Sequence, residues 1–71
     1  MDDYGLRIRS RRIELGMTQD ELAHKVGYND RSAIAKIETG VNDITLKKFK
    51  EIANALDISP SKLMGLEDKN E

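Results

Sequence analysis

Cysteine is missing from this 71-residue chain, and aromatic residues make up only 4% of it, as Tyr4, Tyr28 and Phe49. Without cysteine, neither a disulfide framework nor a thiolate metal site can stabilise the fold. The apolar residues are instead aliphatic, with few β-branched runs. Such a composition favours a core made by helices.

Long apolar runs are also missing. None approaches the roughly 18 residues that span a bilayer, and none resembles the apolar region of a signal peptide. We therefore expect a cytoplasmic protein without a membrane partner. The length of 71 residues suits one small domain. We expect that domain to occupy residues 1–66, with a polar tail over residues 67–71.

An excess of positive charge is missing as well, because the formal net charge is −1. That total argues against a nucleic-acid partner, but DNA responds to the local field of the contact face. The basic residues are clustered, as Arg7, Arg9, Arg11 and Arg12 and again as Lys47, Lys48 and Lys50. On charge alone, these clusters are either solvated helix faces or a surface for DNA.

Local signals divide the chain into five short helices. The first is predicted over residues 3–15. Its apolar side chains fall in two stripes, Leu6 with Ile13 and Ile8 with Leu15. Two stripes favour a helix that is packed on two sides.

The second helix begins at Thr18, which forms a capping-box pattern with Glu21, and ends at Gly27. The third is predicted between a cap at Asp30 and a stop at Gly40. Its spacing directs Ala33, Ile34 and Ile37 inward. The same spacing leaves the remaining side chains of that stretch toward solvent, namely Arg31, Ser32, Ala35 and Lys36.

The fourth helix has Thr45 as its cap, and its apolar residues follow the i, i+3, i+4, i+7 pattern as Phe49, Ile52, Ala53 and Leu56. A last short helix starts with Ser59 as cap and Pro60 in the first turn. We expect Leu63 and Met64 to dock it on the rest of the domain.

The second and third helices form the informative unit. The small side chain of Ala23 allows two helices to cross closely, and Gly27 permits the positive φ that a tight turn between them needs. Ile34 and Ile37 then fix the third helix. Its outer face is left free to enter a major groove of DNA.

In these motifs the sequence resembles the λ-repressor-like helix-turn-helix proteins of the Cro/CI or XRE type. The resemblance runs from Leu6 to Leu66. It is carried by Arg12–Gly16, the Gly-Met-Thr-Gln-Asp-Glu-Leu-Ala block, Ile34–Gly40, the Ile-Ala-Asn-Ala-Leu run and the closing Ser-Pro-Ser-Lys-Leu-Met-Gly. It implies an all-α, compact five-helix domain in which the third helix reads DNA.

The resemblance also implies roles for individual residues. Base contacts fall on Arg31, Ser32 and Lys36, and Arg31 leads because arginine can grip guanine with two hydrogen bonds. Phosphate contacts fall on Arg12, Gln19, Thr39, Asn42, Lys47 and Lys48. Six residues separate Gly27 from Ile34, one more than is commonest in the family. We place the extra residue in the turn before Arg31.

Arg12 and Glu38 correspond to a family pair that joins the first helix to the third. The residues themselves support this pairing. Arg12 lies on an apolar side of its helix, and Glu38 directly follows the inward-facing Ile37. A buried charge without a partner is costly, so a bidentate salt bridge is expected between the two.

The resulting prediction is a transcriptional regulator, a repressor that occupies a two-fold symmetric operator in double-stranded DNA as a homodimer. The expected dimer surface is Leu56 to Ile58 with the short helix after it. Alternatives within DNA binding are the excised domain of a larger self-cleaving phage-type repressor, a restriction-modification controller and an antitoxin. An alternative of another class is a helical protein–protein interaction module, which would show an acidic recognition face.

Nothing in the sequence indicates an enzyme, a metal or a cofactor. His24 is the single histidine, and no second ligand is spaced to join it. Ser32 has no local base partner that would make it a nucleophile. We therefore expect no catalytic residue, metal ligand or cofactor.

Overall fold

The computed structural model of the chain describes residues 4–66. In that part of the chain all regular structure is helical, as α1 (Tyr4–Glu14), α2 (Gln19–Lys25), α3 (Ser32–Glu38), α4 (Leu46–Ala55) and α5 (Pro60–Leu63). The five-helix, all-α architecture is the predicted one. The start of the domain at residues 1–3 and the tail over residues 67–71 lie outside the described residues.

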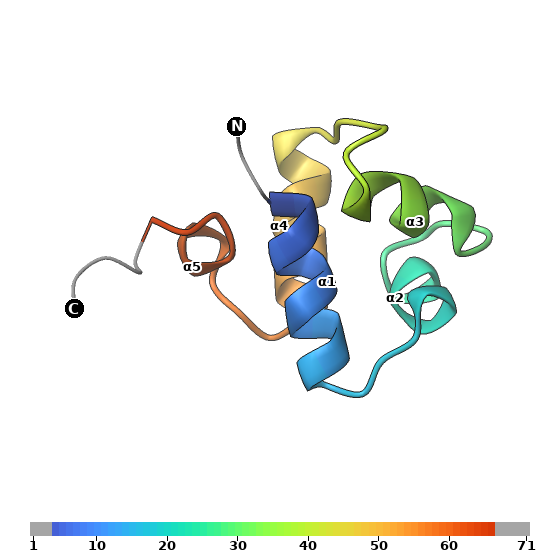
Figure 1. The fold of residues 1–71 in the computed structure, drawn as a ribbon, viewed down its shortest axis with the longest axis horizontal. Helices are drawn as coiled ribbons and strands as arrows, with labels where there is room; N and C mark the ends of the chain where they lie inside the picture. Colours follow the sequence, from blue (N-terminus) through green and yellow to red (C-terminus); the bar gives the residue numbers. More distant parts are fainter. Residues whose placement is uncertain (1–3, 67–71) are drawn as a thin grey trace.

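The two halves of the helix-turn-helix unit lie on one side of α1, and α5 lies on the other side (Figure 1). α1 packs against α3 and α5, α2 packs against α3 and α4, and α4 packs against α5. The unit formed by α2 and α3 is therefore held by α1 and α4 together. None of the helices within residues 4–66 is long and apolar enough to cross a membrane.

Side-chain caps begin three of the helices as predicted. Thr18 Oγ1 accepts the Glu21 N–H, and Glu21 Oε1 accepts the Thr18 N–H at 2.8 Å, which completes the capping box. Thr45 caps α4 and Ser59 caps α5 in the same manner. These local bonds fix where the helices begin because each satisfies a backbone donor that the helix leaves unpaired.

The buried core contains side chains from all five helices, and most of them come from α2, α3 and α4. The buried apolar residues are Ile8, Leu22, Ala23, Val26, Ile34, Ile37, Phe49, Ile52, Ala53, Leu56 and Leu63. The periodic stripe predicted for α4 is confirmed in full. Since Leu56 is fully buried, it cannot contribute its side chain to the predicted dimer surface.

α1 packs on two sides as predicted, but not through its two apolar stripes. Leu6 is 59% and Ile13 is 53% exposed, and Leu15 is also exposed. The contacts are made through Gly5, Ile8 and buried polar groups instead, because α1 approaches α3 closely enough for backbone contact. Met64 is likewise 41% exposed, so Leu63 alone docks α5.

Candidate nucleic-acid interface

The crossing of α2 and α3 depends on a thin contact and a sharp turn. Ala23 is completely buried, and its carbonyl accepts the Tyr28 N–H at 2.9 Å. Gly27 has a φ of +89°, a conformation that L side chains rarely adopt. Both roles match the prediction from the sequence. The turn therefore sets α3 at a fixed angle to α2.

α3 presents one buried side and one exposed side. Ile34, Ile37 and Glu38 are its buried residues, whereas Ser32, Lys36 and the preceding Arg31 are exposed. The three side chains expected to contact bases therefore lie at the surface, on or directly before α3. The two alanines differ from expectation, because Ala33 and Ala35 are both half-buried.

The longer turn is closed by Asp30. Its Oδ1 accepts the Ser32 N–H at 2.9 Å, and this backbone bond is the main cause that lowers the pKa of Asp30. The cap predicted at Asp30 is therefore wrong by one residue, because α3 begins at Ser32 with Arg31 in the N-cap position and without a side-chain cap bond. Asp30 instead closes the turn before the helix. The carboxylate stays ionised beside Arg31, so the exposed end of α3 carries charges of both signs.

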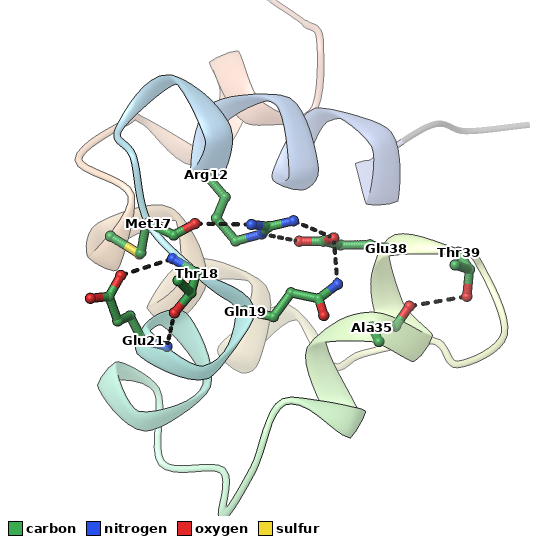
Figure 2. A network of polar contacts seen from close by, with 8 residues as sticks. All are labelled: Arg12, Met17, Thr18, Gln19, Glu21, Ala35, Glu38 and Thr39. Atoms are coloured by element: carbon green, nitrogen blue, oxygen red, sulfur yellow. Dashed lines mark hydrogen bonds and ion pairs between the residues drawn. The ribbon is translucent and has the colours of Figure 1, made fainter.

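A buried polar network joins α1, α2 and α3 at the base of this surface (Figure 2). Arg12 Nε donates to Glu38 Oε2 at 2.7 Å and Nη2 donates to Oε1 at 3.0 Å. The Arg12 and Glu38 side chains are only 10% and 2% exposed. The predicted salt bridge is therefore present, and the hydrogen bonds to Glu38 raise the pKa of Arg12 against the opposing effect of its burial.

Two further hydrogen bonds complete the network. Arg12 Nη1 donates to the Met17 carbonyl at 2.9 Å, and Gln19 Nε2 donates to Glu38 Oε1 at 3.1 Å. Within residues 4–66, no buried side-chain nitrogen or oxygen atom lacks a partner. Full satisfaction of this kind turns a buried ion pair into a rigid connection rather than a liability.

The network limits what Arg12 and Gln19 can offer to a phosphate. Nε of Arg12 is fully used, and each terminal nitrogen keeps one further N–H. Both residues line a shallow groove that also contains Arg31. Their first role is therefore to hold α3 in place, and any contact with DNA uses the N–H groups that remain.

The turn after α3 contains two of the expected phosphate contacts. Thr39 is exposed, but its hydroxyl donates to the Ala35 carbonyl at 3.0 Å. A hydroxyl has a single hydrogen, so Thr39 can donate to a phosphate only by giving up its bond to the Ala35 carbonyl. Asn42 is exposed, and its side-chain amide has the N–H groups that could donate to a phosphate.

The two lysines of α4 have different surroundings. Lys47 is exposed. Lys48 instead donates from Nζ to the Val26 carbonyl at 2.6 Å, forms an ion pair with Glu51 at 2.9 Å and lies 4.8 Å from the centre of the Tyr28 ring. The phosphate contact expected for Lys48 would have to compete with these contacts. Its charge ties α4 to the end of α2.

The role of Gly5 in the contact between α1 and α3 was not predicted from the sequence. A Cβ atom at this position would lie 2.5 Å from the carbonyl oxygen of Ile37 and 2.8 Å from that of Glu38. α1 therefore meets the backbone of α3 directly. A glycine inside a helix was the available signal, since glycine is unfavourable there unless something approaches closely.

The family follows from comparison with known proteins. The pattern of the helix-turn-helix family matches residues 8–63 of the chain. The chain belongs to this family. As a member of it, the chain is a DNA-binding transcriptional regulator of the helix-turn-helix type.

Several solved helix-turn-helix structures are similar to it. The restriction-modification controller protein C.AhdI from Aeromonas hydrophila is 37% identical, with a TM-score of 0.79 over 84% of this chain and 86% of that chain. The P22 c2 repressor, solved with a synthetic operator, is 28% identical, with a TM-score of 0.82 over 94% and 100%. SinR, solved with DNA, is 30% identical, with a TM-score of 0.76 over 84% and 95%.

Proposed function

We propose that the chain regulates transcription by placing α3 in the major groove of a specific double-stranded operator. The observation that carries the proposal is the exposed side of α3, which is held at a fixed angle by the buried Arg12–Glu38 pair. Arg31, Ser32 and Lys36 then read base edges, with Arg31 bound to guanine.

The positioning contacts come from three places. Gln19 is the first residue of α2, Thr39 and Asn42 follow α3, and Lys47 lies on α4. In this proposal all four meet the DNA backbone. Arg12 adds at most its two remaining N–H groups. Lys48 is left out of this set because its Nζ is bound inside the domain.

We propose that two copies bind together to a two-fold symmetric operator. The P22 c2 repressor and SinR were solved with DNA, and helix-turn-helix dimers read half-sites about one helical turn apart. Ile58 lies between α4 and α5 and is half-buried, and Met64 is exposed. The proposed contact surface on each copy is therefore the exposed side of α5 and of the segment around Ile58. Occupation of a promoter by such a dimer would repress it, with no enzymatic step, in the cytoplasm where the DNA lies.

Selection of bound duplexes from a random pool tests this proposal. A two-fold symmetric consensus with half-sites about 10 base pairs apart is the expected result. Footprinting of the selected duplex must then protect both half-sites. If no duplex were enriched, sequence-specific binding would be rejected. If a single half-site were protected, dimeric binding would be rejected.

A more specific candidate is a controller of restriction and modification genes. The identity of 37% with C.AhdI and of 32% with a variant of C.Esp1396I, which is also a restriction-modification controller protein, favours it. The positions of the selected consensus in the source genome distinguish this role from the regulation of other genes. A controller predicts matches upstream of restriction or modification genes in the source genome, whereas matches elsewhere alone would reject it.

The protein–protein module is not favoured. That alternative required an acidic recognition face, but Arg31 and Lys36 are exposed on or beside α3. Asp30 is the single acidic residue among residues 30–36. Its carboxylate is bound to the backbone N–H of Ser32, where it closes the turn before α3.

A further inference from the structure

The four arginines of α1 do not form one basic surface, because the structure gives them different surroundings. Arg12 is buried against Glu38. Arg11 donates to the carbonyls of Leu56 and Asp57 at 2.9 and 3.1 Å and so fastens the end of α4. Arg7 lines the groove between α1 and α5. Arg9 alone of the four lines the groove on the α3 side of the helix.

Arg9 shares a face of α1 with Gly5 and Arg12. Residues three and four apart lie on the same side of a helix, and these three are spaced by four and three positions. Gly5 touches the backbone at the end of α3, and Arg12 binds Glu38 in the last turn of α3. The charged end of Arg9 is therefore confined to the neighbourhood of the same end of α3.

Arg9 is exposed, and within the described part of the chain it forms neither a hydrogen bond nor an ion pair. The groove that it lines has a volume of about 590 Å³ and is bounded by Gly5, Leu6, Arg9, Gln19, Ala35, Glu38, Thr39 and Gly40. The one acidic member is Glu38. Its carboxylate is already bound by Arg12 and Gln19, so its charge is balanced inside the domain.

This groove opens on the recognition side of α3. Ala35 and Thr39 line it, and they lie one turn from Ser32 and Lys36 on the same face of the helix. Gln19 lines it from α2. A DNA backbone that passes the end of α3 would therefore meet the groove and its unpaired cation together.

We propose that this groove seats a phosphate of the DNA backbone and that Arg9 supplies the positive charge for it. The proposal rests on the proposed function and adds a contact from α1, outside the helix-turn-helix unit. Arg9 contributes affinity without base preference, since a phosphate is the same at every base pair. A bidentate guanidinium suits phosphate oxygens, and a lysine would still supply the charge.

The experiment compares Arg9→Gln with Arg7→Gln and Arg9→Lys on two duplexes, the one selected by the wild-type chain and an unrelated one of equal length. Dissociation constants are measured between about 50 and 200 mM NaCl. Arg7→Gln is the matched control because it removes the same charge from the other side of the same helix. Thermal melting of each variant reports its folding.

Arg9→Gln is expected to weaken binding to both duplexes by the same factor. It should also lower the slope of log affinity against log salt by about 0.9, so that its deficit shrinks about threefold across that salt range. Arg7→Gln and Arg9→Lys should keep the wild-type slope.

A wild-type slope in Arg9→Gln would overturn this proposal alone. A lower melting temperature beside it would mean that Arg9 only stabilises the end of α3. If the wild-type chain itself bound neither duplex, the proposed function would fail together with this inference. Equal slope losses in Arg9→Gln and Arg7→Gln would also reject it, because the effect would then not depend on the groove.

Discussion

The guanidinium of Arg12 and the carboxylate of Glu38 face each other as a bidentate pair, with Nε–Oε2 and Nη2–Oε1 distances of 2.7 and 3.0 Å. Gln19 binds the same carboxylate at 3.1 Å. One buried acid thus fixes three helices relative to one another. In the proposed function, the angle at which α3 would meet DNA depends on this acid, although Glu38 itself lies beneath the surface.

Glu38→Gln should lower the free energy of unfolding by up to about 3–5 kcal/mol, because Arg12 remains buried without a charged partner. Urea denaturation measures the loss. Glu14→Gln is the control, because Glu14 pairs with Arg11 and its side chain is 65% exposed. Exposed ion pairs contribute about 0–1 kcal/mol. The double variant Arg12→Met with Glu38→Leu should recover much of the stability but not the DNA affinity. Unchanged melting and unchanged affinity in Glu38→Gln would contradict the assigned role.

Gly5→Ala should destabilise the domain even though alanine is the better helix former. The new Cβ would lie 2.5 Å from the Ile37 carbonyl oxygen, and backbone atoms cannot move aside as a side chain can. Overpacking of this kind costs about 1–3 kcal/mol. Ser10→Ala, at an exposed position of the same helix, should be neutral or slightly stabilising. A Gly5→Ala variant more stable than the wild type in urea would show that the α1–α3 contact is not this close.

Lys47→Met and Lys48→Met should separate two kinds of lysine. Lys48→Met loses the bond to the Val26 carbonyl and should cost about 1–2 kcal/mol of stability, with the salt slope of DNA binding unchanged. Lys47→Met should leave stability unchanged and lower that slope by about 0.9. Denaturation and salt titration of both variants check this. A reduced slope in Lys48→Met would contradict this prediction and show that Lys48 contacts a phosphate.

Arg31→Ala should relax the preference for one base pair in each half-site. The loss of a bidentate guanine contact costs about 1–3 kcal/mol at that position and little on other sequences. Asn42→Ala is the comparison, because a lost phosphate contact weakens binding to all duplexes alike. Repeated selection with each variant gives the result. An unchanged consensus for Arg31→Ala would show that Arg31 does not contact the base. A neighbouring residue of the longer turn would then be the candidate for that contact.

Much of the fold follows from signals within a few residues of one another. The capping box of Thr18 with Glu21 and the i, i+3, i+4, i+7 stripe of α4 fix helices locally, and the structure contains both. The buried pair was predictable for a related reason. A charge on an apolar side of a helix requires a partner, and the resemblance to the family pointed to Glu38, directly after the inward-facing Ile37, as that partner.

Apart from the Arg12–Glu38 pair, only the tertiary structure decided what the charged and exposed side chains face. Lys47 and Lys48 are adjacent in sequence, but Lys47 is exposed, whereas Lys48 donates to the carbonyl of Val26, 22 residues away. Leu6 and Ile13 form an apolar stripe that turns outward because Gly5 and Arg12 determine which side of α1 meets α3. The sequence by itself determined the helices and the inward apolar residues of α2, α3 and α4, since both depend on periodicity and local hydrogen bonds. The placement of Arg9 beside Gln19 and Thr39 depends on how α1 packs, which no local pattern encodes.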